Sequence, residues 1–132
     1  MTVDIGLLGA GGMAKTHLEN FDAVGARLVG VCSRTEESAR ALAEPRDAPT
    51  YSDVESLLED ADPDAVIVAV PPFAHEGQER LVAEHGVALF VEKPLALSRE
   101  TAREVRDAVE ANDVVTQVGH QFRYADVVER AH

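Results

Sequence analysis

The sequence has no tryptophan, a single cysteine and no long apolar run. One cysteine, Cys32, cannot form an internal disulfide, and no cluster of cysteine and histidine has the spacing of a metal site. The apolar segment 5–13 is broken by four glycines and has no basic residue before it, so it does not resemble a secretory signal peptide. No segment reaches the ~20 apolar residues that a membrane-spanning helix needs. We therefore expect a cytoplasmic protein without a metal site, a disulfide or a membrane span.

Basic residues are also scarce: 12 lysines and arginines stand against 24 aspartates and glutamates, which gives a net charge of −12. A surface this acidic repels a phosphate backbone, so the composition argues against nucleic acid as a partner. Abundant carboxylates with few lysines are typical of salt-adapted, halophilic proteins. A GC-rich genome produces a similar bias, and the sequence leaves both explanations open.

What the sequence does contain is the apolar pattern of an α/β protein. Apolar, strand-like runs occupy residues 3–8, 28–32, 65–70, 87–91 and 114–118. Several of them are continuously apolar, which suits strands that are buried on both faces of a parallel sheet. Helical spacing lies between them, at residues 12–23, 35–44, 53–60, 75–85 and 98–111, with Thr35, Ser52 and Ser98 as expected N-caps. Right-handed crossovers then predict a doubly wound parallel sheet of the Rossmann type, in a chain whose 132 residues suit one domain.

A glycine-rich turn, GAGGMA, follows the first expected strand. Gly9, Gly11 and Ala14 match G-x-G-x-x-G/A at the start of a helix, and Gly12 and Met13 lie in the same turn. In a dinucleotide site the first glycine permits the turn, the second lets the backbone approach a pyrophosphate, and the small third residue lets the helix pack on the sheet. The helix N-terminus attracts the phosphates. We predict dinucleotide binding, against the alternative of a glycine-rich turn without a ligand.

The end of the second expected strand indicates which dinucleotide binds. An NAD-specific site usually places Asp or Glu here, on the adenosine ribose, whereas this chain has Ser33 followed by Arg34. A hydroxyl accepts a 2′-phosphate where a carboxylate repels it, and an arginine pairs with it. These two residues favour NADP over NAD, the alternative being a surface loop with a solvated arginine.

The last residues, FRYADVVERAH, have the pattern of another amphipathic helix. We interpret residues 1–120 as a dinucleotide-binding domain and residues 121–132 as the start of a connection to a C-terminal α/β domain that is absent from this sequence.

Four segments together, GLLGAGGMAKTHLENF, VAVPPFAH, VEKP and VGHQFRY, resemble the N-terminal domain of the glucose-fructose oxidoreductase, inositol dehydrogenase and MocA family. The resemblance implies a two-domain, NAD(P)-dependent dehydrogenase or reductase that acts on a sugar, a polyol or a related hydroxy or keto compound. It also implies a homo-oligomer at full length, and a fragment that binds cofactor but turns over no substrate without its second domain.

Only two lysines, Lys15 and Lys93, occur in the whole chain. The resemblance places Lys93 at the carboxyl end of its strand, beside nicotinamide and substrate, as a catalytic residue that also contacts the cofactor. A lysine there donates to the substrate oxygen and helps to move the hydroxyl proton, which a permanently charged arginine does only in part. Glu92 would position the lysine and contact the cofactor, and Pro94 would fix the turn. The alternative is a solvated loop lysine.

The resemblance also points to residues after the third expected long strand. His75 would lie near the nicotinamide, and Pro71 and Pro72 would shape the loop beside the dinucleotide; Pro72 replaces the asparagine of many relatives. A structural hydrogen bond is an alternative role for His75. His17 matches a further family position, where packing is its expected role.

Arg123 and His120 could face the active-site cleft, although a segment that joins two domains also needs polar residues. Two other functions stay open at this point. A regulatory nucleotide-sensing domain has the same fold and length but no need for Glu-Lys-Pro, and an inactive scaffold could retain the fold without activity.

Overall fold

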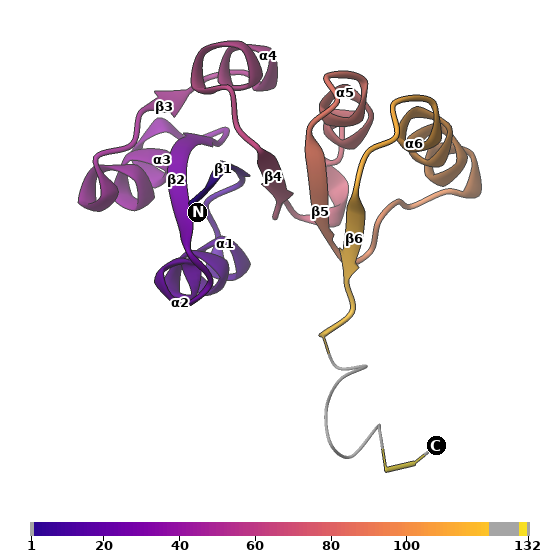
Figure 1. Ribbon diagram of the computed structural model, residues 1–132, viewed down its shortest axis with the longest axis horizontal. Coiled ribbons are helices and arrows are strands. Elements are labelled where there is room, and N and C mark those ends of the chain that lie inside the picture. The colour runs from indigo at the N-terminus through magenta and orange to yellow at the C-terminus, as the bar shows by residue number, and fades with distance from the viewer. Residues whose placement is uncertain (1, 122–129, 132) are drawn as a thin grey trace.

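The computed structural model describes residues 2–121 and 130–131. Its six strands form one sheet in the order β3-β2-β1-β4-β5-β6, and every neighbouring pair is parallel (Figure 1). The strands are β1 Val3–Leu8, β2 Ala26–Cys32, β3 Thr50–Tyr51, β4 Ala65–Val68, β5 Ala88–Glu92 and β6 Thr116–Gly119. Strand order reverses at β1, which pairs with β2 on one side and with β4 on the other. This topology confirms the predicted doubly wound sheet.

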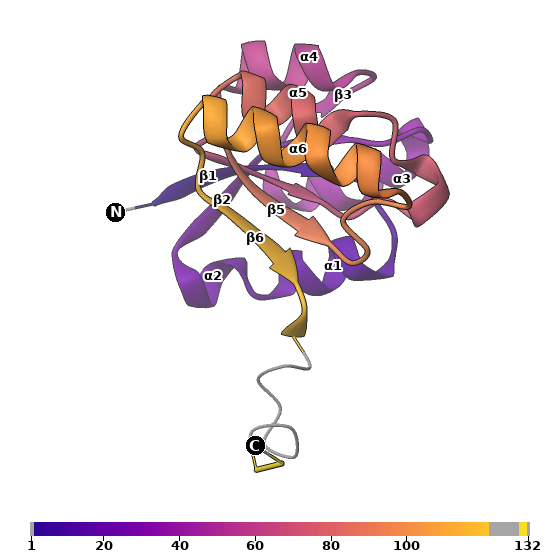
Figure 2. The same ribbon diagram turned by 90° about the vertical axis from the view of Figure 1, so that its right-hand side faces the viewer.

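Helices cover both faces of the sheet, with α1 and α2 on one side and α4, α5 and α6 on the other (Figure 2). The α-helices are α1 Gly12–Glu19, α2 Phe21–Val24, α3 Glu36–Ala43, α4 Val54–Ser56, α5 Gln78–Glu84 and α6 Arg99–Ala111. Two 3-10 turns, η1 Glu44–Arg46 and η3 Pro72–Ala74, and one π-helical turn, η2 Leu57–Ala61, complete the described structure.

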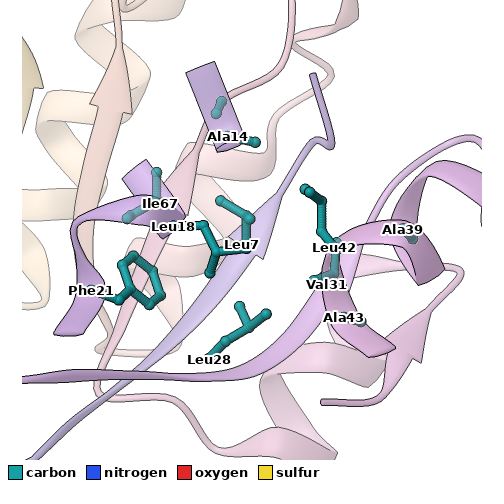
Figure 3. Packing of buried hydrophobic residues seen from close by; sticks show 11 residues of the cluster. Leu7, Ala14, Leu18, Phe21, Leu28, Val31, Ala39, Leu42, Ala43 and Ile67 are labelled. Carbon is teal, nitrogen blue, oxygen red and sulfur yellow. The ribbon is translucent and has the colours of Figure 1, made fainter. Parts of the chain in front are cut away.

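The core consists of two apolar clusters, one on each face of the sheet. Successive residues of a strand point to opposite faces, so Leu7 joins the first cluster and Leu8 the second. The first cluster packs the sheet against α1, α2 and α3 (Figure 3), and the second packs it against η2 and α5. Both leucines are almost fully buried, at 0% and 2% exposure. Burial on both faces explains why the inner strands β4 and β5 are nearly continuous apolar runs.

Four predicted helices differ in detail from the structure. The helix expected at 12–23 breaks at Asn20, whose side-chain amide donates to the carbonyl of Thr16. The helix expected at 53–60 is a short α-helix that continues as the π-helical turn. The helix expected at 75–85 begins at Gln78, because Gly77 before it adopts a left-handed conformation. The helix expected at 35–44 ends at Ala43.

The N-cap predictions have mixed outcomes. Ser98 caps α6, and its hydroxyl accepts a hydrogen bond from the amide of Thr101. Thr35 occupies the N-cap position of α3 but makes no capping bond with its side chain. Ser52 was the wrong residue for α4: Asp53 caps it, because its carboxylate reaches the amide of Ser56 at 2.8 Å.

Strand β3 has only two residues and no apolar run, so the sequence pattern did not predict it. The C-terminal helix and Arg123 fall largely on residues 122–129 and 132, outside the described residues, and the division at residue 120 stays a prediction. Among the described helices, none has both the length and the apolar character to cross a membrane.

Candidate functional site

A cleft of about 980 Å³ lies at the carboxyl ends of β1, β2, β4 and β5. Its walls come from the glycine turn, the segment after β2, the loop between β4 and α5, and the end of β5. Strands β2 and β5 are three sheet positions apart, or roughly 14 Å at ~4.8 Å per position. Open parallel sheets bind their ligands at this edge, where the strand order reverses.

The glycine turn is fixed by close backbone contacts. Gly9 has a φ of +99°, and a Cβ at this position would lie 2.4 Å from the carbonyl oxygen of Ala69. The amide of Gly9 donates to the carbonyl of Cys32 at 2.8 Å, and the amide of Ala69 donates to that of Leu8 at 2.8 Å. Only glycine fits here. The turn is therefore held between the ends of β2 and β4.

Gly11 and Gly12 differ from Gly9, because a Cβ on either would meet no atom within 4 Å. Both line the cleft together with Met13. The space above these two glycines is therefore open to a ligand that approaches the backbone. Ala14 is fully buried in the first apolar cluster and does not line the cleft.

The N-terminus of α1 is suited to an anion. Gly11 is its N-cap and supplies no side-chain acceptor, and the first turn contains no acidic residue. Each of the other described α-helices has an acidic residue in its first turn. The amides of the first turn of a helix have no acceptor within the helix, and the helix dipole adds partial positive charge. Although the chain has a net charge of −12, the start of α1 can therefore attract a phosphate without repulsion from a carboxylate in its first turn.

Ser33 and Arg34 directly follow β2 and line the cleft. They are the residues that the sequence predicted for the adenosine end of the dinucleotide. The Arg34 guanidinium pairs with Glu76 at 2.6 Å, from the loop before α5. Asp53 and Glu55 line the cleft as well. Burial raises the pKa of the Cys32 thiol, and the charges of Asp53 and Glu55 raise it further, so both carboxylates act on the end of β2.

Glu92 is the last residue of β5 and is buried at 7% exposure, although its side chain reaches the cleft. One carboxylate oxygen lies 2.5 Å from Nε2 of His17, on α1. The His17 ring also packs edge-on against Phe90, with ring centroids 5.0 Å apart. Gly119 leaves room for this carboxylate, since a Cβ at this position would lie only 3.0 Å from Oε2. The structure therefore ties α1 to the Glu-Lys-Pro turn through a bond that the sequence did not reveal.

Lys93 follows Glu92, is exposed and lines the cleft. The peptide bond between Lys93 and Pro94 is cis. Within the described residues the Lys93 ammonium has no ion-pair partner. The structure thus gives Glu92 the partner His17, and the positioning of Lys93 by Glu92 stays a prediction.

The remaining predicted residues differ in whether they line the cleft. Pro71 and Pro72 line it, whereas His75 does not. The His75 side chain is 7% exposed and bonds through Nδ1 to Glu79, a carboxylate that is itself buried. His120 is exposed and also lies outside the lining. The bond between His75 and Glu79 links the residue after η3 to α5, and the sequence did not indicate it.

No group of three or more potential metal ligands occurs in the part of the chain that the structure describes. A doubly wound sheet, a glycine turn at a helix start without a carboxylate, and a cleft across the strand-order reversal together define a dinucleotide-binding domain. The chain belongs to the oxidoreductase family with an NAD-binding Rossmann fold, whose pattern matches residues 3–120. This match confirms the resemblance drawn from the four sequence segments.

Among its relatives is the inositol 2-dehydrogenase/D-chiro-inositol 3-dehydrogenase of Lacticaseibacillus casei, with 35% identity in an alignment 129 residues long that covers 94% of this chain and 37% of the relative. The structure of GenD2 from gentamicin A biosynthesis, in complex with NAD, superposes with a TM-score of 0.90 at 32% identity. The WlbA dehydrogenase of Chromobacterium violaceum, in complex with NADH and UDP-GlcNAcA, gives a TM-score of 0.91 at 25% identity. The superpositions cover 99% and 98% of this chain, which spans only 38% of each structure.

The two glycines of the turn provide a matched pair for testing the site. Gly9→Ala should lower the free energy of unfolding by about 2 kcal/mol or more, because the new methyl group collides with backbone at a strained φ. Gly11→Ala should cost no more than about 1 kcal/mol, since its Cβ meets nothing. Gly11→Ala should nevertheless raise the Kd for the nucleotide by ~10-fold or more, which corresponds to ~1.4 kcal/mol of binding free energy. Urea unfolding and calorimetric titration measure the two effects. Unchanged nucleotide affinity in a folded Gly11→Ala variant would contradict the assignment of the turn.

The bond between His17 and Glu92 yields a stability prediction. His17→Phe retains a ring against Phe90 but removes the donor and leaves a buried carboxylate without this partner. We expect a loss of about 1–3 kcal/mol in the free energy of unfolding, measured by urea denaturation at neutral pH. Lys15→Ala, at an exposed position of the same helix, is the control and should change it by less than ~0.5 kcal/mol. Equal stability of both variants would show that the bond contributes nothing.

Proposed function

We propose that the cleft binds a nicotinamide dinucleotide, and that the full-length protein is a dehydrogenase or reductase of a sugar, a polyol or a related hydroxy or keto compound. The observation that carries the proposal is the arrangement of the cleft. The glycine turn and the start of α1, whose first turn has no carboxylate, lie at the centre of the cleft. Ser33 and Arg34 follow β2 on one side, and Lys93 follows β5 on the other. The family match and relatives named as inositol dehydrogenases support the reaction class.

The residues present suit such a cofactor. The open backbone at Gly11 and Gly12, with the amides of the first turn of α1, would hold the pyrophosphate. Ser33 and Arg34 would hold the adenosine end. The bound nicotinamide would supply hydride chemistry at the end of β5, beside Lys93. His75 does not line the cleft, so a cofactor contact from it would need the loop after β4 to change its position.

Lys93 is proposed as the catalytic residue. Its ammonium is exposed in the cleft and has no ion-pair partner within the described residues, so it is available to a substrate oxygen. It would donate a hydrogen bond to that oxygen and, when deprotonated, would accept the hydroxyl proton during oxidation. Glu92, held by His17, would fix the turn from which the lysine projects.

Lys93→Met tests this role in the full-length protein. Turnover should fall about 10²- to 10⁴-fold, whereas nucleotide affinity should change far less, because the lost interaction belongs to the proton transfer. Steady-state kinetics with myo-inositol and a panel of related polyols measure the first quantity, and titration with the nucleotide measures the second. Lys15→Met is the control on the exposed side of α1. Small effects of both substitutions would remove the catalytic role and favour a nucleotide-sensing domain or an inactive scaffold.

NADP is the cofactor that we propose, on the basis of Ser33 and Arg34 at the cleft. A hydroxyl and a guanidinium provide a donor and a positive charge for a 2′-phosphate, in the position where NAD-specific sites have a carboxylate. Because the GenD2 and WlbA structures contain NAD or NADH, the proposed preference for NADP depends on Ser33 and Arg34 and not on these two relatives. The homo-oligomeric state at full length likewise stays a prediction.

Titration with NADPH and NADH tests the cofactor preference. NADPH should bind more tightly, and Ser33→Asp should reverse the order by placing a carboxylate against the 2′-phosphate. The reversal should weaken as salt is added, because ions screen exposed charges over ~10 Å at 0.1 M. Equal affinities for the two nucleotides in the unmodified protein would contradict the NADP proposal.

A further inference from the structure

The ion pair between Arg34 and Glu76 connects two walls of the cleft. Arg34 follows β2, whereas Glu76 belongs to the loop between η3 and α5, and both line the cleft. The guanidinium Nη2 and the carboxylate Oε1 are 2.6 Å apart. Side-chain exposures of 64% and 67% leave the pair in contact with solvent. Exposed pairs of this kind contribute ~1 kcal/mol at most, so a ligand with a stronger charge can open it.

The backbone of Glu76 is held in place by its neighbours. Its amide donates to the side-chain carbonyl of Gln78 at 2.6 Å, and the amide group of Gln78 donates to the carbonyl of Ala74 at 2.8 Å. Gly77, with a φ of +92°, lets the chain turn between them into α5. This arrangement directs the Glu76 carboxylate to Arg34 from a defined position on the opposite wall.

The cleft that contains Arg34 also contains other carboxylates, which repel an anionic ligand group such as a phosphate. Besides Glu76, the carboxylates of Asp53 and Glu55 line the cleft, and both act on Cys32 at the end of β2. Hydrogen bonds from Ser56 keep the pKa of Asp53 below its usual value, so this carboxylate is ionised at neutral pH. The cleft thus contains further carboxylates besides that of Glu76, which pairs with the guanidinium. A 2′-phosphate must compete with Glu76 for Arg34, whereas a 2′-hydroxyl has no need of the guanidinium.

We propose that Glu76 is a specificity-determining residue, which limits the preference for NADP over NAD by occupying the guanidinium that a 2′-phosphate requires. This inference rests on the proposed function of the cleft as a dinucleotide site. It predicts that the carboxylate of Glu76 weakens the binding of NADP and has little effect on the binding of NAD. It also predicts that the effect of Glu76 passes through Arg34.

Glu76→Gln tests the inference, because glutamine retains the size of the side chain and removes its charge. Calorimetric titration of the full chain with NADPH and with NADH, at low salt, should show NADPH binding about 3- to 5-fold more tightly in the variant. The affinity for NADH should stay within about twofold. Adding Arg34→Ala to the variant should abolish the gain for NADPH.

Glu84→Gln is the matched control. Glu84 also pairs with an exposed arginine, Arg80, and its removal changes the net charge by the same amount, but it does not line the cleft. An NADPH gain in this control as large as that of Glu76→Gln would assign the effect to net charge and overturn the inference. An unchanged ratio of the two affinities in Glu76→Gln would also overturn it, while leaving the dinucleotide site in place. Failure of both nucleotides to bind the unmodified protein would overturn the proposed function and this inference with it.

Discussion

The site depends on the close approach of Gly9 to the backbone of Ala69. The chain leaves β1 with a φ that favours glycine, and the carbonyl of Ala69 occupies the space that any side chain would need. Hydrogen bonds to Cys32 and from Ala69 then join the ends of β1, β2 and β4. Because β1 is the strand at which the order reverses, this contact places the start of α1 at the cleft.

Charge is distributed around this contact in an unusual way for so acidic a chain. The net charge of −12 opposes any anionic ligand at long range, yet the first turn of α1 contains no carboxylate. Lys93, one of only two lysines, lies at the end of β5, and Arg34 lies at the end of β2. The two cationic side chains thus lie toward opposite ends of the cleft, although four carboxylates, those of Asp53, Glu55, Glu76 and Glu92, line it as well. One of these carboxylates, Glu76, pairs with Arg34.

The sequence predicted the parts of the structure that depend on local pattern. Five of the six strands appeared as apolar, strand-like runs, and the runs are most nearly continuous in strands inside the sheet, such as β4 and β5, where both faces are covered. Strand β3 did not, since two residues carry no pattern. Contacts between distant residues were equally invisible: His17 and Glu92 are 75 positions apart, and nothing in either segment indicates the other. The same holds for Arg34 and Glu76, which meet only because the loops after β2 and β4 end at one edge.

The central claim is that the pyrophosphate of a nicotinamide dinucleotide binds at the start of α1. Titration of the isotopically labelled protein with NADPH, followed by the backbone amide resonances in NMR spectra, tests it most directly. The amide resonances of Gly11, Gly12 and Met13 should shift most strongly, together with those of Ser33 and Arg34, because phosphates act on the amides to which they bind. Saturable shifts elsewhere in the molecule, with the glycine turn unchanged, would contradict it.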